Sequence, residues 1–199
     1  IPWMGHAINR QCKVVYLDFE LKPRLAKERI KEIINSQGNE YFPTKNFMYC
    51  GLRGQSRSLE DLALHIQAIK DFEPDMVIVD PFYKLGGDYD ENDAGSVGLV
   101  LDKMETFSER LDCAFVYAHH FSKGNKAETD HIDRASGSGV FARDPDAILT
   151  LTPHEEDYHL VLEATLRNFP TPEKKVIEFS WPNFIHKPDL EPNLRKAGQ

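Results

Sequence analysis

Residues 75–98, DMVIVDPFYKLGGDYDENDAGSVG, decide the fold of this chain. The continuous, β-branched run at residues 76–79 is typical of a strand buried on both faces, and it ends at Asp80. Open parallel sheets bind ligands at the carboxyl ends of their strands, so Asp80 is placed to hold Mg²⁺ through water beside the phosphates of a nucleotide. The alternative is that Asp80 only closes a strand before the turn at Pro81. Pro81, Gly86, Gly87 and the acidic run at residues 88–93 predict a long surface loop, and loops of that length are usually functional.

Length and composition predict a single globular core. The chain has 199 residues, of which 41% are hydrophobic. We expect one domain over residues 1–187 and a flexible, polar tail at residues 188–199. The formal net charge is −8, which excludes a wholly basic surface that coats nucleic acid but not local basic loops.

The cysteines and the chain start bear on the cellular location. Cys12, Cys50 and Cys113 are an odd number without zinc-like spacing, as in a reduced, cytoplasmic protein. No apolar run is long enough to span a bilayer, and the start has no secretory pattern, so we expect no membrane association. The chain begins with Ile1 rather than methionine, which suggests a fragment of a longer polypeptide.

Alternating strand and helix patterns predict an α/β fold. Apolar runs predict strands, and stripes at helical spacing predict helices between them. The strands are expected at residues 13–20, 47–50, 76–79 and 113–118, and the helices at residues 21–37, 58–72 and 97–111. This alternation is typical of a mostly parallel sheet flanked by helices. Short links between four further strands, at residues 147–151, 158–166, 175–179 and 184–186, predict an antiparallel C-terminal extension of the sheet.

Polar residues end three of the predicted parallel strands. Asp18 and Glu20 end the first, Asp80 ends the third, and His119 and His120 follow the fourth. If these strands are neighbours, the side chains converge on one edge, where they can supply a base, a metal-holding carboxylate and a phosphate sensor for nucleoside triphosphate hydrolysis. Glu20 as a solvated strand end, and the two histidines as a hydrogen-bonded pair, are the alternatives.

The same residues resemble a known family. The D-x-E pattern at residues 18–20, the strand ending in Asp80-Pro81, HHFSKGN at residues 119–125 and DRASGSG at residues 133–139 look like the RecA-like ATPases. Within them the chain is most similar to the AAA_25 or RepA-like branch, which includes hexameric replicative helicases of plasmids. The resemblance implies a RecA-like sheet, ATP and Mg²⁺ as ligands, and a homo-oligomeric ring.

The resemblance also implies roles for individual residues. Glu20 would be the catalytic base that polarises the attacking water, and Asp80 the Walker B carboxylate associated with Mg²⁺. His120 would occupy the sensor position, with His119 the second choice.

An arginine acting across a subunit interface is a further implication. ATLRNFP at residues 164–170 is similar to a helicase strand with a Lys-x-Arg pair that reaches a neighbour's γ-phosphate. Here Thr165 replaces the lysine and Arg167 keeps the arginine, so Arg143 and Arg134 remain candidates for the residue that acts in trans.

The phosphate-binding loop is the main departure from the family pattern. A P-loop contains a Gly-Lys dipeptide, and none occurs in these residues. The resemblance places the P-loop upstream of Ile1, so we expect this chain alone to bind ATP poorly and to be inactive.

Two polar loops leave the same predicted sheet edge and carry basic residues, which are Lys84, Lys123, Lys126 and Arg134. In RecA-like rings such loops line the channel that holds single-stranded DNA, and lysines there would follow the phosphates in a salt-dependent way. A solvated loop without a ligand is the alternative. The aromatic residues Phe82, Tyr83 and Phe121 either stack on bases or belong to the core.

These observations predict the core of an ATP-dependent, ring-forming motor, a RepA-like replicative DNA helicase of a plasmid, phage or other mobile element. One alternative is a RecA-like regulatory ATPase without DNA translocation. The other is a non-catalytic oligomerisation or binding domain.

Overall fold

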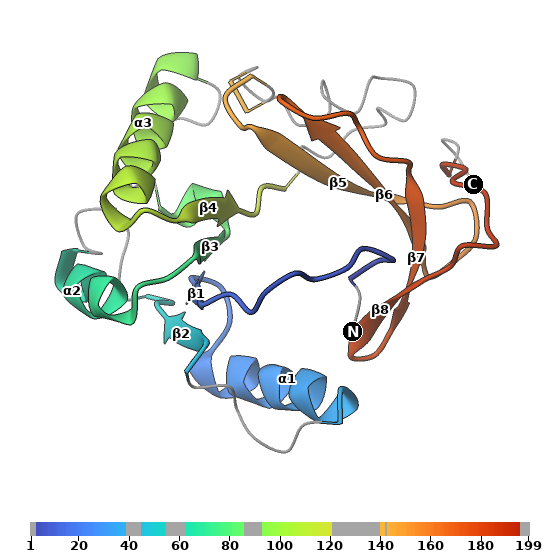
Figure 1. Cartoon of the computed structure of the whole chain (residues 1–199), viewed down its shortest axis with the longest axis horizontal. Helices are drawn as coiled ribbons and strands as arrows, with labels where there is room; N and C mark the ends of the chain where they lie inside the picture. The colour runs from blue at the N-terminus through green and yellow to red at the C-terminus, as the bar shows by residue number, and fades with distance from the viewer. Residues whose placement is uncertain are drawn as a thin grey trace. The chain divides into compact units, whose positions relative to one another are not determined.

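The computed structural model describes residues 3–38, 45–54, 63–85, 93–120, 140–141 and 143–195. The chain divides into two compact units, one formed by Arg10–His120 and the other by Ile1–Asn9 with Phe121–Gln199. The first contains a four-stranded parallel sheet and the second a four-stranded antiparallel sheet (Figure 1). The predicted RecA-like class, a parallel sheet flanked by helices and followed by antiparallel strands, is confirmed, but the antiparallel strands form a separate sheet and not an extension of the parallel one.

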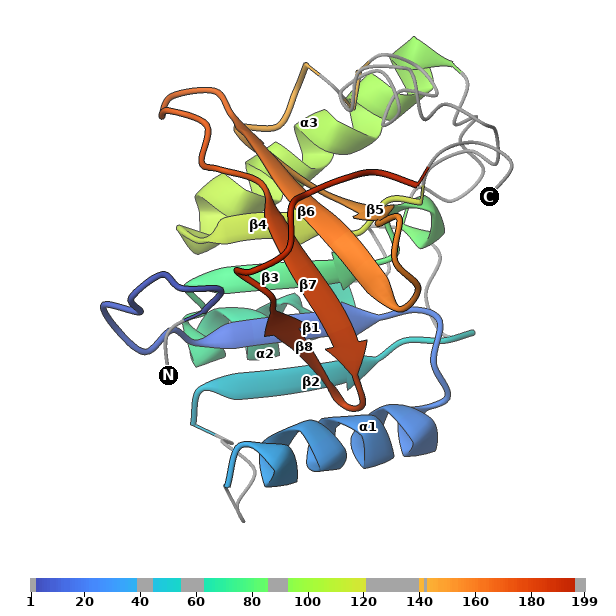
Figure 2. The same ribbon diagram turned by 90° about the vertical axis from the view of Figure 1, so that its right-hand side faces the viewer.

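The parallel sheet has the strand order β2-β1-β3-β4 (Figure 2). Its strands are β1 (Val14–Asp18), β2 (Phe47–Gly51), β3 (Met76–Asp80) and β4 (Ala114–Tyr117). β1 therefore lies between β2, the strand that follows it in the chain, and β3. Each strand lies within about two residues of its predicted position.

The helices are α1 (Pro23–Ser36), α2 (Ala63–Phe72) and α3 (Ala94–Leu111). Figure 1 shows α2 and α3 on one side of the parallel sheet and α1 on the other. α3 begins three residues before the predicted Val97, because Asp93 is its N-cap and accepts a 2.7 Å hydrogen bond from the amide of Ser96. The predicted beginning of the second helix, and most of the acidic loop before α3, lie outside the described residues.

The core of this unit lies along the two central strands. Val15 and Leu17 of β1 and Val77 and Val79 of β3 are fully buried, and burying each such side chain contributes about 1.5–3 kcal/mol. Met76 and Ile78, on the other face of β3, are only half-buried, so the predicted burial on both faces holds completely for one face. This rigid central pair determines where the carboxyl ends of β1 and β3 lie.

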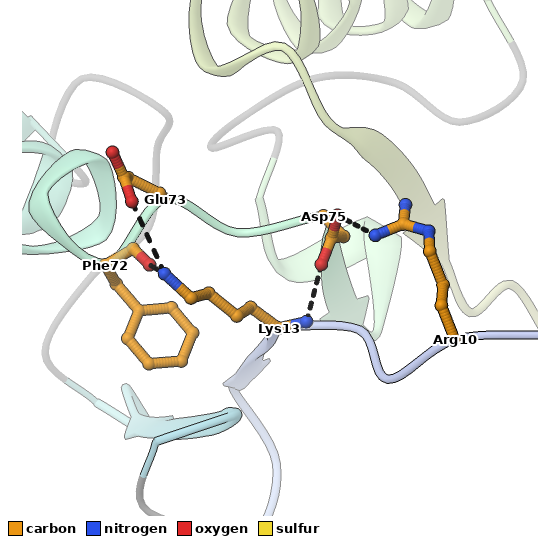
Figure 3. A network of polar contacts seen from close by, with 5 residues as sticks. All are labelled: Arg10, Lys13, Phe72, Glu73 and Asp75. Carbon is orange, nitrogen blue, oxygen red and sulfur yellow. Dashed lines mark hydrogen bonds and ion pairs between the residues drawn. The ribbon is translucent and has the colours of Figure 1, made fainter.

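A polar network fixes the opposite, amino-terminal ends of β1 and β3 (Figure 3). The Asp75 carboxylate accepts a 2.7 Å hydrogen bond from the backbone amide of Lys13 and forms a 2.6 Å ion pair with the guanidinium of Arg10. These contacts hold the pKa of Asp75 below its usual value, with the Lys13 amide as the largest cause. The Lys13 ammonium donates to the carbonyl of Phe72 at 3.1 Å and lies 3.4 Å from the Glu73 carboxylate, which ties the end of α2 to the start of β1.

The second unit is an antiparallel meander in the order β5-β6-β7-β8. Its strands are β5 (Ala147–Pro153), β6 (His159–Leu166), β7 (Lys175–Ser180) and β8 (Asn183–His186). All four were predicted. The buried Glu163 carboxylate of β6 pairs at 2.6 Å with the ammonium of Lys174, which offsets the cost of burying its charge.

Residues 188–195, part of the predicted flexible tail, contact the β5–β6 hairpin. Buried His154 accepts from the amide of Glu156 through Nδ1, so its Nε2 donates to the carbonyl of Glu191 at 2.8 Å. Arg195 reaches the carboxylate of Asp157 at 2.6 Å. The domain boundary at residue 187 and the mobility of the tail stay predictions.

Among the described helices, none is long and apolar enough to cross a membrane. All three cysteines are free thiols, and burial raises the pKa of Cys50 and of Cys113.

Candidate active site

The carboxyl ends of β1 and β3 bring two aspartates together. Asp18 and Asp80 are register partners in the β1–β3 pair, and Asp18 is the partner of Gly51 on β2. The pairing continues past the strands, since the amide of Phe19 donates to the carbonyl of Asp80 at 2.9 Å. The convergence expected for the first and third strand ends is therefore present.

Asp18 organises the turn that follows β1. Its side chain is 1% exposed, and its Oδ1 accepts hydrogen bonds of 2.8 Å from the backbone amides of Glu20 and Leu21. Its Oδ2 accepts from the hydroxyl of Tyr49 at 3.1 Å. Both carboxylate oxygens are thus engaged within the protein, and Asp18 is a structural residue of the site.

The turn corrects one prediction. Period-two alternation placed Asp18 and Glu20 on one face of a strand that continued to residue 20, but β1 ends at Asp18. The Asp18 side chain takes the amide hydrogens that would continue a sheet, so the backbone turns and Glu20 becomes exposed.

Glu20 is held by a residue from the segment that follows β3. The hydroxyl of Tyr83 donates to Oε1 of Glu20 at 2.6 Å. Tyr83 lies in η1 (Phe82–Lys84), a single 3₁₀ turn after the cis peptide bond between Asp80 and Pro81. Because Glu20 is exposed, its second oxygen remains accessible to solvent.

Asp80 is suited to bind Mg²⁺ together with the phosphate oxygens of a nucleotide. It is half-buried, and its Oδ2 accepts a short hydrogen bond from the hydroxyl of Tyr16. In the described part of the chain no cluster of three or more metal-ligating side chains occurs. Mg²⁺ is commonly held by one or two carboxylates, water and substrate phosphates, so the single carboxylate of Asp80 fits Mg²⁺ bound together with a nucleotide.

Sequence reasoning missed that each of the three acidic residues is paired with a tyrosine. We call these contacts the tyrosine–carboxylate pairs, and they are Tyr16–Asp80, Tyr49–Asp18 and Tyr83–Glu20. Tyr16 and Tyr49 are also register partners with stacked rings, 6.2 Å apart between centroids. The sequence shows only that Tyr16 shares a face with Asp18 of its own strand, two residues on, and the partner on a neighbouring strand depends on strand order and register.

Burial and the adjacent carboxylates keep these hydroxyls protonated. Burial is the largest cause that raises the pKa of Tyr49 to about 12, followed by the negative charge of Asp18. The pKa of Tyr16 is raised more than that of Tyr49, with burial as the largest cause and the hydrogen bond to Asp80 as the second. Both tyrosines are therefore hydrogen-bond donors at neutral pH.

Gly51 makes room for the Tyr49–Asp18 pair. A Cβ atom at Gly51 would lie 3.0 Å from the Tyr49 hydroxyl and 3.0 Å from Cγ of Pro23 at the start of α1. Any larger residue there would push the hydroxyl away from Asp18.

The two histidines follow β4 at the same sheet edge. The amide of Ala118 donates to the carbonyl of Val79 at 2.9 Å, and the carbonyl of Ala118 accepts from the amide of Phe82 at 2.8 Å. His119 and His120 come next, the first half-buried and the second exposed. The sensor role of His120 stays a prediction.

Among the basic candidates, Lys84 is exposed and its ammonium lies 5.0 Å from the centroid of the Tyr83 ring. The other predicted DNA contacts, Lys123, Lys126 and Arg134, lie outside the described residues. Phe82 is fully buried, so it belongs to the core rather than to a base-stacking surface.

Arg167 belongs to the other unit, where it closes a loop. Its guanidinium donates to the carbonyls of Arg143 and Asp144, the latter at 2.7 Å, and lies 3.4 Å from the carboxylate of Asp146. The side chain is 49% exposed, and Arg143 is exposed as well. In this conformation Arg167 stabilises the turn before β5.

Replacing Asp18 by alanine is expected to destabilise the protein by about 2–4 kcal/mol, because two amides and a hydroxyl lose their acceptor. Urea unfolding measures the change in the free energy of unfolding. Glu28→Ala, which removes an exposed ion pair on α1, is the control and should cost less than about 0.5 kcal/mol. Equal effects of the two substitutions would show that Asp18 does not organise the turn.

Alkaline pH should weaken the fold through Tyr49. Its pKa lies above the ordinary value of 10 in the folded state, so its contribution to stability is complete below pH 10 and is lost as the pH rises toward 12. The urea midpoint of the wild type should therefore fall over this range. Tyr49→Phe should have a lower midpoint at pH 8 and a smaller further loss, whereas identical slopes for both proteins would exclude this cause.

Comparison with known proteins identifies the family. The AAA_25 family, described as an AAA domain, matches residues 1–126. None of the curated proteins matches the chain. Among solved structures, the RadB recombinase is similar with a TM-score of 0.58 and 15% sequence identity over 87% of this chain and 78% of that chain, a likeness that shows the fold. The chain belongs to the AAA_25 family of AAA domains and has a RecA-like fold.

Proposed function

We propose that this chain is the core of an ATP-dependent, RecA-like motor, a RepA-like replicative DNA helicase of a plasmid, phage or other mobile element. The observation that carries the proposal is the register pairing of Asp18 with Asp80, which brings the Glu20 turn and a metal-compatible carboxylate to one sheet edge. Membership of the AAA_25 family and the RecA-like fold support an ATPase.

In the proposed reaction, Glu20 orients water for attack on the γ-phosphate and accepts its proton through the exposed carboxylate oxygen. Asp80 would hold Mg²⁺ through water, and the bound ion would neutralise charge on the phosphate oxygens. His120 contacts the transferred phosphoryl group. The 199 residues contain no Gly-Lys dipeptide, so the P-loop that cradles the phosphates is not among them.

Assembly into a ring would complete the site with an arginine from a neighbouring subunit. To act in this way, Arg167 must release its hydrogen bonds to the carbonyls of Arg143 and Asp144 and contact the neighbour's nucleotide instead. Arg143 is exposed, and it and Arg134 are the other candidates. Hydrolysis would then depend on the homo-oligomer, a hexamer in the proposed family of helicases.

The DNA component of the proposal rests on Lys84, after β3, and on the basic residues that follow β4 in the sequence. Lys84 is exposed beside Glu20's partner Tyr83, and Lys123, Lys126 and Arg134 follow β4 in the sequence. Positive side chains suit the phosphates of single-stranded DNA, with sequence-tolerant and salt-sensitive affinity. A cytoplasmic location is part of the same proposal.

A second candidate is a RecA-like regulatory ATPase that does not translocate on DNA. The acidic stretch at residues 88–93 and the net charge of −8 favour it, because both weaken the attraction of DNA to this edge. Basal ATP turnover that single-stranded DNA leaves unchanged would select this candidate. A non-catalytic oligomerisation domain predicts no turnover at all.

In the full-length gene product, Glu20→Gln should leave ATP affinity unchanged and lower turnover by at least ~100-fold, because an amide orients water without accepting its proton. Steady-state hydrolysis and equilibrium binding of ATP measure the two quantities. Glu28→Gln, the same change on the exposed face of α1, should behave as the wild type. Turnover by Glu20→Gln within a few-fold of the wild type would remove Glu20 from the mechanism.

A further inference from the structure

We propose that Tyr83 is the positioning residue for the catalytic base, a role that rests on the proposed function of Glu20. Tyr83 does not touch the reacting atoms. It lies in the turn after β3 and holds the Glu20 carboxylate in one orientation through the hydrogen bond of 2.6 Å to Oε1.

Glu20 needs such a partner because its side chain is exposed and has several rotatable bonds. Asp18 fixes only the backbone of Glu20, through the 2.8 Å hydrogen bond to its amide. Within the described residues, the hydroxyl of Tyr83 is the hydrogen-bond donor that the structure gives to the Glu20 carboxylate. Backbone and carboxylate are thus held by two different elements.

Tyr83 is itself mounted on a rigid support. Its neighbour Phe82 is fully buried, and the Phe82 amide donates to the carbonyl of Ala118 after β4 at 2.8 Å. Leu85 closes the same turn from a position that is 1% exposed, with its amide 2.9 Å from the carbonyl of Phe82. A side chain on a turn anchored at both ends can orient a flexible partner accurately.

The geometry leaves the base able to work. The phenol hydroxyl of Tyr83 donates to Oε1, so Oε2 of Glu20 remains available to accept a proton from water. A base held within a narrow range of orientations reacts faster without binding its substrate more tightly, so the role of Tyr83 should be visible in kcat rather than in KM.

Tyr83→Phe tests this role with the smallest change. Phenylalanine removes the hydroxyl and keeps the ring on which the Lys84 ammonium lies, so binding of single-stranded DNA should be preserved. In the full-length gene product we expect kcat for ATP hydrolysis to fall by between ~10- and ~100-fold, with KM for ATP and affinity for single-stranded DNA within about 2-fold of the wild type. Tyr158→Phe is the matched control, because Tyr158 is 84% exposed on the other unit.

A double-mutant cycle separates positioning from a general structural effect. If Tyr83 acts through Glu20, then Tyr83→Phe combined with Glu20→Gln should hydrolyse ATP no more slowly than Glu20→Gln alone. A second cycle uses Glu20→Ala in place of Glu20→Gln, because the amide oxygen of glutamine can still accept from the Tyr83 hydroxyl. In urea unfolding without nucleotide, Tyr83→Phe and Glu20→Ala should shift the midpoint less than additively, since each removes the same contact.

The outcomes distinguish this inference from the proposed function. If the wild type hydrolyses ATP and Tyr83→Phe has the same kcat, the positioning role is overturned while the proposed function stands. Additive effects in both cycles would have the same meaning. A folded and assembled wild type without ATP hydrolysis would overturn the proposed function, and the role of Tyr83 with it. Lowered kcat, preserved KM and a non-additive cycle together support it.

Discussion

The Asp18 carboxylate is the interaction on which the candidate active site depends. It is buried at the end of the central strand β1, and it accepts two backbone amides from the turn and one tyrosine hydroxyl from β2. A buried charge is tolerated when it is hydrogen-bonded so fully. By taking these amides it ends β1, sends the chain into α1 and leaves Glu20 exposed beside β3. Asp18 therefore builds the site, whereas Glu20 and Asp80 are the carboxylates proposed to act in it.

Around Asp18, the tyrosine–carboxylate pairs tie together elements that are far apart in the sequence. Tyr16 of β1 binds Asp80 of β3, and Tyr83 after β3 binds Glu20 after β1. One tyrosine comes from β1 and binds the carboxylate at the end of β3, and the other follows β3 and binds the carboxylate after β1. Each strand end therefore holds a carboxylate of the other. Such reciprocal support holds the two carboxylates in fixed positions. The network around Asp75 performs the corresponding structural task at the amino ends of the same strands.

The sequence was sufficient for the strands, the helices and the fold class because they follow strong periodic patterns, from the run at Met76 to the four antiparallel strands. It did not show that the antiparallel strands form a sheet of their own. It also located Asp80 at a strand end, because an apolar run that stops at a charge marks that end clearly. It failed where a side chain competes for backbone hydrogen bonds, since Asp18 and Asp93 each redirect the chain locally. The tyrosine partners depend on strand order and register, which periodicity along one strand does not specify.

The most direct test of this account is ATP hydrolysis by the full-length gene product, measured with and without single-stranded DNA at low and moderate salt. The account predicts turnover that rises when DNA is added, with a stimulation that weakens as salt screens the basic loops. Turnover that does not change when DNA is added would support an ATPase and contradict a motor that translocates on DNA. No turnover from a folded, assembled protein would contradict the central claim that the edge formed by Glu20 and Asp80 is catalytic.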